Sequence, residues 1–184
     1  MPPKNSSSKN LNENISVDCV VFGFDGTELH VLLIDREDEM RNVASAYALP
    51  GNLIYDQENL NQAAQRVLKE LTGLSDIYLE QFGAFGDPNR IKKKEDQPWL
   101  KAVRTNPDAR VVTIAYYALI RMSDFKLNPS SFAKDATWVP LKDIKHLPFD
   151  HFEILNQSVA YLRNNTKIRP VAVSYTHLTL PTTD

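Results

Sequence analysis

An amphipathic helix with clear signals at both ends constrains the fold of this chain most. Apolar residues recur at three- and four-residue spacing from Leu60 to Leu71, which is the period of a helix with one buried face. Asn59 precedes them, where an N-cap side chain accepts hydrogen bonds from free backbone amides. Gly73 follows them, where a left-handed residue is needed. The sequence therefore predicts a helix over residues 60–72.

Strands are predicted on both sides of this helix. Residues 15–24 and 28–36 are rich in β-branched and aromatic residues and flank Asp25-Gly26-Thr27, which indicates a hairpin. The longest apolar stretch, residues 110–120, indicates a central strand buried on both faces. The other expected elements are strands over 77–85 and 136–141 and a helix over 152–165, capped by Asp150. This order predicts an α/β (α+β) fold.

The chain divides into one domain and two tails. A length of 184 residues suits a single domain with its own core, which we place at 15–171. The polar composition of residues 1–14 predicts disorder, and residues 172–184 have no period that belongs to the domain. An insertion at 91–108, with a lysine run and Trp99, allows two interpretations. It is either a lid or partner contact, or a solvated excursion that Trp99 anchors on the core.

Charge and cysteine content exclude several classes of protein. The 21 basic and 23 acidic residues nearly balance, so the chain has no overall electrostatic footprint for nucleic acid. Cys19 is the single cysteine, which excludes an internal disulfide and suits a reducing compartment. No apolar run approaches the ~20 residues that span a bilayer, and the start lacks the apolar centre of a signal peptide. We expect a cytoplasmic protein without a membrane segment.

Residues 49–74, LPGNLIYDQENLNQAAQRVLKELTGL, resemble the Nudix box, G-x5-E-x7-R-E-U-x-E-E-x-G-U, where U is aliphatic. The resemblance implies a Nudix fold, in which helices sandwich a mixed β-sheet. The residues that take up box positions are Asn52 at the first glycine, Glu58, Arg66, Leu68, Glu70, Gly73 and Leu74. Two positions depart from the box, since Val67 and Leu71 stand where it has its second and fourth glutamates.

The two lost glutamates bear directly on catalysis. Val67 and Leu71 lie four residues apart, on the same face of a helix, where the family's carboxylates hold a divalent cation. An aliphatic side chain offers no lone pair to magnesium, which prefers oxygen ligands. We therefore expect no intact catalytic site. Glu58, Arg66 and Glu70 remain as vestiges, and the two glutamates retain at most a weak, water-mediated magnesium site. The Arg66 and Glu70 pair is either a surface ion pair or part of a unit in which Arg66 orients Glu58.

The resemblance also implies candidate ligand-binding residues. These are Arg36, Asn52, Arg90, Arg110, Tyr116 and His151. For two of them the residues allow another interpretation. Tyr116 suits a base or sugar contact but also ordinary sheet packing, and His151 is either a ligand contact at a helix start or a neighbour of the cap.

Segments outside the box make the resemblance more specific. RVLKELTGL, QFGAFGDPNR, RVVTIAYYALI, TWVPL and FDH resemble the sensor domain of bacterial Nudix-related transcriptional regulators that control sugar or NAD utilisation. This resemblance implies a homodimer that binds an effector such as ADP-ribose or a pentose, needs no cofactor, and contacts DNA only through a following winged-helix domain. That domain is expected to be missing here, since a tail that looks foreign to the domain follows Val171.

Two other functions stay open from the sequence. One is an active, magnesium-dependent pyrophosphohydrolase that cleaves a nucleoside diphosphate-linked substrate such as ADP-ribose. The other is a protein-interaction domain with a relic pocket. A screen for ligands, run beside a hydrolysis assay, separates the three.

Overall fold

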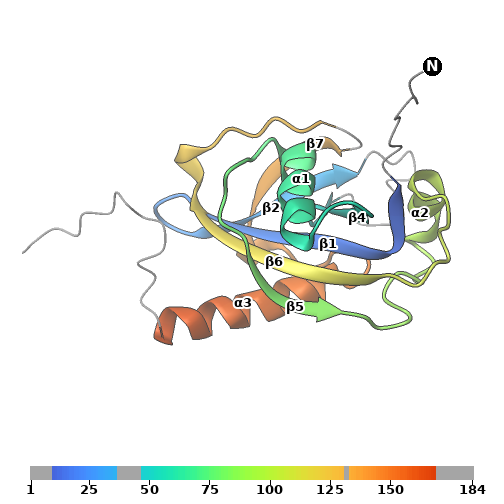
Figure 1. Ribbon diagram of the computed structural model, residues 1–184. Coiled ribbons are helices and arrows are strands. Elements are labelled where there is room, and N and C mark those ends of the chain that lie inside the picture. Colours follow the sequence, from blue (N-terminus) through green and yellow to red (C-terminus); the bar gives the residue numbers. More distant parts are fainter. Residues whose placement is uncertain (1–9, 37–46, 131–132, 169–184) are drawn as a thin grey trace, which may run out of the picture.

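A mixed sheet forms the middle layer of the molecule, and helices lie on both of its faces (Figure 1). The computed structural model describes residues 10–36, 47–130 and 133–168. Within these residues the strands are β1 (Leu11–Phe24), β2 (Leu29–Arg36), β3 (Tyr47–Ala48), β4 (Gly51–Tyr55), β5 (Glu80–Phe85), β6 (Val112–Arg121) and β7 (Ala133–Pro140). The helices are α1 (Leu60–Thr72), α2 (Gln97–Val103) and α3 (His151–Ile168), with 3-10 turns η1 (Met122–Asp124) and η2 (Leu141–Asp143). The expected α+β arrangement is confirmed.

The long strand β1 organises the sheet. It pairs antiparallel with β2, as the predicted hairpin requires, and parallel with β6. β4 also pairs with β1, while β5 pairs with β6, and β3 and β7 pair with β2. The central strand predicted at 110–120 is β6, which lies between β1 and β5. Alternation along β6 sends Tyr116 and Tyr117 to opposite faces, where they pack in different apolar clusters.

The helix predicted over residues 60–72 is present with the same bounds. Asn59 forms a capping box with Gln62: each side chain accepts the other residue's backbone N–H at 2.9 Å. Gly73 ends α1 at φ +80°, and a Cβ there would collide with the backbone of Asn128. The apolar face of α1 packs on the sheet over Cys19 and its neighbours through Ala63, Ala64, Val67, Leu68 and Leu71.

Helix α3 covers the opposite face of the sheet (Figure 1). It buries Ile154, Leu155 and Leu162 in a cluster with side chains of β1, β2 and β6. The predicted second long helix is therefore confirmed. The expected N-cap hydrogen bond of Asp150 is not confirmed, because the Asp150 carboxylate accepts two hydrogen bonds from Arg90 instead.

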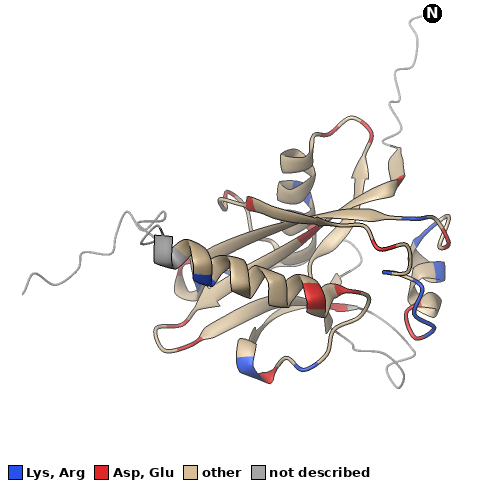
Figure 2. Cartoon of the chain, turned by 90° about the horizontal axis from the view of Figure 1, so that it is seen from below, with Lys and Arg blue, Asp and Glu red and all other residues tan. Residues whose placement is uncertain are grey.

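The insertion at 91–108 is a folded part of the domain and carries α2. Leu100 is fully buried and joins Ile91 in a third apolar cluster, with Trp99 packed against it. The buried Asp96 carboxylate accepts the backbone N–H of Phe149 at 2.9 Å, which ties the insertion to the chain before α3. The alternative that the insertion is a solvent-exposed loop fits only the exposed lysine run at 92–94. Figure 2 shows basic residues gathered around this segment.

Strand β1 begins four residues earlier than its composition indicates. The predicted disorder of residues 1–14 is wrong for residues 11–14, because backbone pairing holds this polar stretch. Leu11 pairs with Tyr55 of β4, and the Asn14 side chain donates to the carbonyl of Arg110 at 2.8 Å. Main-chain hydrogen bonds of this kind leave no apolar pattern in the sequence. Residues 1–9 and the tail at 172–184 lie outside the described residues.

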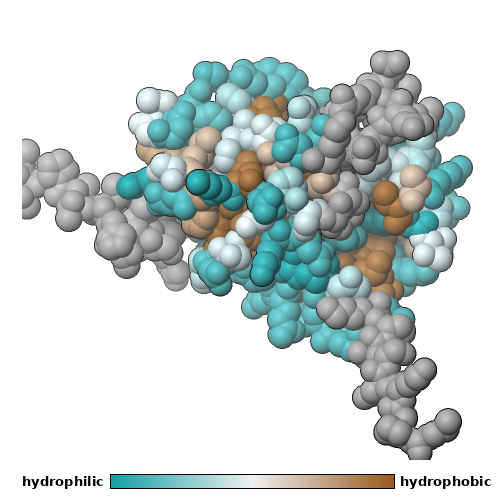
Figure 3. Space-filling view, turned by 90° about the horizontal axis from the view of Figure 1, so that it is seen from above, coloured by the Kyte–Doolittle hydropathy of each residue, from teal (hydrophilic) through white to brown (hydrophobic). Residues whose placement is uncertain are grey.

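The surface of the molecule is mainly polar. The face that carries α1 is mostly hydrophilic, with small separate apolar areas (Figure 3). Large exposed apolar side chains are dispersed over several elements, which is ordinary for a protein surface. They are Leu11, Phe24, Tyr47, Tyr78 and Val103. None of the described helices has both the length and the apolar character needed to cross a bilayer.

Candidate functional site

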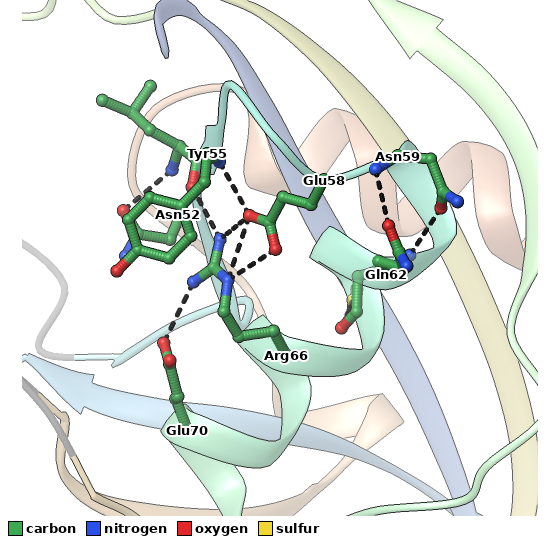
Figure 4. Close-up of polar contacts among 10 residues, drawn as sticks. Asn52, Tyr55, Glu58, Asn59, Gln62, Arg66 and Glu70 are labelled. Carbon is green, nitrogen blue, oxygen red and sulfur yellow. Dashed lines mark hydrogen bonds and ion pairs between the residues drawn. The ribbon is translucent and has the colours of Figure 1, made fainter. Parts of the chain in front are cut away.

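Arg66 stands at the centre of a polar network that joins α1 to β4 (Figure 4). Its Nε donates to both oxygens of Glu58, at 3.0 and 2.9 Å, and its Nη1 donates to Glu70 at 3.0 Å. Its Nη2 donates to Glu58 at 2.5 Å and to the carbonyl of Leu53 at 3.1 Å. The guanidinium also lies 4.3 Å from the ring centre of Tyr55. Arg66 therefore fixes the loop and Glu58, which is one of the two interpretations of its sequence position.

The Arg66–Glu58 pair is partly buried, whereas Glu70 lies at the rim. The side chains of Arg66 and Glu58 are 14% and 12% exposed, and that of Glu70 is 36% exposed. Burial lowers the pKa of Arg66, but the hydrogen bonds and charges of the two glutamates outweigh it and raise the pKa above its usual value. Only the Arg66–Glu70 contact resembles the surface ion pair that the sequence also allowed.

The box positions that differ from the family are part of the core. Val67 is fully buried and Leu71 is 1% exposed, both in the cluster between α1 and the sheet. The oxygens of Glu58 are engaged by Arg66 and by the backbone N–H of Tyr55, at 2.7 Å. The described residues include no group of three or more histidine, cysteine or acidic side chains arranged to hold a metal ion. This donor set does not fit a divalent cation.

A pocket lies between β1, β4, the insertion and the start of α3. Ser16 and Asp18 contribute to it from positions of β1 that alternate with the residues facing α1. Its cavity volume is about 30 Å³, room for about two water molecules or one compact group. The lining residues are Ser16, Asp18, Ile34, Ala48, Leu49, Gly51, Asn52, Arg90, Ile91, Trp99, Arg104, Phe149 and His151.

A buried network of charged side chains forms one wall of this pocket. Arg90 donates to both oxygens of Asp150 at 2.8 Å, and its Nη2 lies 3.4 Å from Asp18. The other oxygen of Asp18 lies 3.3 Å from Nε2 of His151. Nδ1 of His151 accepts the backbone N–H of Leu49 at 3.1 Å, which assigns the ring proton to Nε2. The network thus joins β1, the segment before α2, and the start of α3.

Asp18 is ionised within this network. Burial raises the pKa of its carboxyl group, but the neighbouring His151 and Arg90 outweigh that effect and hold the pKa well below its usual range. Gly51 permits the arrangement, because a Cβ at that position would collide with the Asp18 carboxylate. The charge of Asp18 therefore depends on two partners distant in sequence, and the missing side chain of Gly51 leaves room for the carboxylate.

Aromatic side chains also line the pocket. The rings of Trp99 and Phe149 lie 5.9 Å apart, and those of Phe149 and His151 lie 5.1 Å apart. Arg104, which follows α2, also lines the pocket. The insertion thus contributes both apolar surface and a guanidinium group to the same cavity.

The structure brings together half of the predicted ligand residues. Asn52, Arg90 and His151 line the pocket. Tyr116 does not, because it is buried beneath α1 with its hydroxyl on Asn61 at 3.0 Å. Arg110 is exposed and donates to the carbonyl of Gly86 at 3.1 Å, away from the pocket. Arg36 ends β2, and its side chain lies outside the described part of the chain. The vestigial Glu58, Arg66 and Glu70 meet in the separate network of Figure 4.

Sequence patterns missed most of the residues that line the pocket, among them two charged residues and an aromatic one. Asp18 interrupts the apolar run ISVDCVVF, and a lone acid in a buried strand is a usable signal, since it needs a partner. Arg104 stands in an insertion without periodicity, and Phe149 precedes α3 by two residues. Nothing local distinguishes these two from ordinary loop residues, because only the tertiary fold brings them to the cavity.

A mixed sheet between two helices, with a capped helix whose arginine holds the preceding glutamate, is the architecture of a Nudix domain. The family model for the NUDIX domain matches residues 13–158. The chain belongs to the Nudix family.

The relatives of known function include a regulator and an enzyme. The chain is 30% identical over 164 residues to the ADPR responsive transcriptional repressor NtrR of Acinetobacter baylyi, covering 87% of this chain and 58% of that protein. It is 26% identical over 125 residues to an ADP-ribose pyrophosphatase of Methanocaldococcus jannaschii, covering 68% of this chain and 63% of the enzyme. It therefore spans less than two thirds of either relative.

One solved structure is similar to this chain over most of the length of both. The NUDIX domain of Shewanella oneidensis NrtR, crystallised in complex with ADP ribose, matches with a TM-score of 0.64 and 25% identity. The match covers 86% of this chain and 94% of that domain. This chain is thus a Nudix domain similar to that of the NrtR regulators.

Proposed function

We propose that this chain is the effector-binding sensor domain of a bacterial transcriptional regulator, and that it binds ADP-ribose or a related pentose compound without cleaving it. The observation that carries the proposal is the burial of Val67 and Leu71 in the core, at the two box positions where the family places metal-binding carboxylates. Arg66 still holds Glu58, the loop and β4 in place. Such a box keeps its shape without the means to bind the metal that activates water.

The relatives support ADP-ribose as the first ligand to test. The repressor of A. baylyi is described as ADPR responsive, and the S. oneidensis domain was crystallised with ADP ribose. The pocket offers groups that suit such a ligand, namely Asn52, Arg90, Trp99 and His151. Because the cavity volume is only about 30 Å³, a molecule of this size places one of its groups inside and the remainder outside.

The proposal extends to partners of a longer protein. The formal net charge of −2 provides no electrostatic attraction to DNA, so DNA contact would belong to a winged-helix domain beyond the Nudix domain. Regulators with that domain bind paired half-sites as two-fold dimers, which supports a homodimer that works in the cytoplasm.

A thermal-shift titration tests the binding step. ADP-ribose, NAD and ribose are titrated separately into the protein without magnesium, and the melting temperature is recorded. We expect ADP-ribose to raise the melting temperature with a saturating dose response, because a ligand that binds only the folded state stabilises it. If none of the compounds shifts the melting temperature, the sensor proposal fails and the interaction-domain alternative gains support.

An active hydrolase remains a second candidate function, because an ADP-ribose pyrophosphatase is among the relatives and Glu58 and Glu70 are present. A hydrolase would release AMP from ADP-ribose. This release would depend on magnesium, and the double variant E58Q/E70Q would lose it. We expect no such release at the rates of ordinary enzymes, about 1–10³ s⁻¹.

A further inference from the structure

Arg104 brings an unsatisfied donor to the pocket. It is the C-cap residue of α2, and its backbone N–H donates to the carbonyl of Leu100 at 2.9 Å. Because Leu100 is buried in the core, this hydrogen bond fixes the position of the Arg104 backbone. Its Nη1 atom is buried and has no hydrogen-bond partner among the described residues. Buried side-chain donors nearly always have an acceptor, so an orphaned guanidinium nitrogen beside a cavity indicates that the acceptor comes from a ligand.

The other charges that line the pocket already have partners. Arg90 is held by both oxygens of Asp150 and by Asp18, and Asp18 is shared with His151. Within the described residues, no ion pair includes Arg104. Burial lowers the pKa of Arg104 and the like charge of Arg90 lowers it further, while Asp18 offsets only part of this. Among the charged side chains that line the pocket, that of Arg104 is therefore the one with no ion-pair partner among the described residues.

We propose that the pocket is an anion subsite in which Arg104 binds a phosphate or carboxylate group of the ligand. The inference deepens the proposed function and rests on it for the identity of the rest of the ligand. The cavity volume of about 30 Å³ suits a carboxylate or the outer oxygens of a phosphate. The rings of Trp99 and Phe149 add apolar surface to the lining, and an ion pair is stronger beside apolar surface than in open water.

The source of Arg104 gives this subsite a role in specificity. Arg104 and Trp99 come from the insertion at 91–108, outside the Nudix box, whereas Asn52 comes from the box itself. The common part of the fold thus supplies most of the lining residues, and the insertion supplies the cation that has no ion-pair partner among the described residues. A ligand without an anionic group would leave that cation unpaired, so the insertion selects for phosphorylated or carboxylated ligands.

The test compares R104Q with K101Q in the intact chain. Lys101 is an exposed basic residue of α2 that does not line the pocket, so K101Q makes the same change of charge at a matched site. The melting temperature without ligand is measured first, and affinities for ADP-ribose, inorganic pyrophosphate and uncharged adenosine are then measured by calorimetry. R104K is included because lysine keeps the charge but loses the planar fork.

We expect R104Q to lower the affinity for ADP-ribose and pyrophosphate about ten- to a hundredfold, as loss of a charge-assisted hydrogen bond does. The melting temperature of R104Q without ligand should stay the same or rise, because a partly buried charge without an ion-pair partner has been removed. K101Q should behave as the wild type, R104K should recover part of the affinity, and adenosine should bind R104Q and the wild type alike.

Three outcomes overturn the anion subsite. These are unchanged affinity of R104Q for ADP-ribose, a fall in its melting temperature without ligand that K101Q does not share, and failure of the wild type to bind either anionic probe. The first leaves the sensor proposal intact. A fourth result separates the two proposals. If the wild type binds pyrophosphate, R104Q does not, and neither binds ADP-ribose, the anion subsite is supported and ADP-ribose is ruled out as the effector.

Discussion

Asp18 is a charged residue inside the sheet, and ionic partners compensate for its burial. It lies in an otherwise apolar part of β1, is 4% exposed, and has Arg90 and His151 as partners. Arg90 reaches it from the turn after β5, and His151 from the start of α3. Asp18 therefore stabilises the contact between three distant segments only while it is ionised.

Replacing Asp18 with asparagine should lower the free energy of unfolding by about 1–3 kcal/mol at pH 7, because His151 and Arg90 each lose a charged partner while Arg90 keeps Asp150. The pKa of Asp18 is lower in the folded protein than in the unfolded chain, so its contribution is complete above about pH 5 and declines as pH falls below about 4. Urea unfolding at several pH values measures this difference.

The control for D18N is D143N, a change at an exposed aspartate, which should alter the stability little at any pH. A difference between wild type and D18N that is the same at pH 3 as at pH 7 would contradict the role given to the Asp18 charge.

Arg66 works by geometry as well as by charge. An R66K variant keeps the charge but cannot reach Glu58, Glu70 and the Leu53 carbonyl at once, since lysine lacks the planar fork. We expect the free energy of unfolding to fall by about 2 kcal/mol, measured by chemical denaturation. R110K, at an exposed arginine with one backbone contact, is the matched control. Equal losses in the two variants would refute the central role of Arg66.

At the scale of elements, α1 and α2 differ in what specifies them. The bounds, caps and buried face of α1 follow from its own residues, because Asn59, Gly73 and the apolar period act locally. Helix α2 depends on contacts made elsewhere, through Leu100 in its cluster and Asp96 on the backbone before α3. The start of β1 likewise depends on pairing with β4. Local patterns therefore predicted α1 fully and missed the other two.

Leu71 tests the claim that a former metal position now serves the core. L71A should lower the free energy of unfolding by about 2–5 kcal/mol, because the side chain is 1% exposed and its removal leaves a cavity under α1. K69A, an exposed change on the same helix, should cost little. Guanidinium unfolding compares the two, and a loss below 1 kcal/mol for L71A would show that the position is not packed as described.

At the scale of the whole molecule, the fold was predictable from sequence and the pocket only in part. Apolar segments and turn residues indicated where most strands lie along the chain and which two form the hairpin, and the box gave the register of the loop and α1. The order of the strands in the sheet was not among the predictions. The box also explained why Glu58, Arg66 and Glu70 meet. Arg104 and Phe149 join Asn52 and His151 only through tertiary contacts of the insertion, which no spacing records. Of the two interpretations that the sequence left open for Tyr116, sheet packing is the one that its burial in the core supports.

The central claim is that the domain binds ADP-ribose and leaves it intact. Phosphorus NMR of ADP-ribose, mixed with a stoichiometric amount of protein and magnesium, reports both events in one sample. We predict that the diphosphate resonances broaden or shift as ligand binds and that no phosphomonoester resonances appear over several hours. Growth of the resonances of AMP and ribose 5-phosphate, abolished in E58Q/E70Q, would contradict the account.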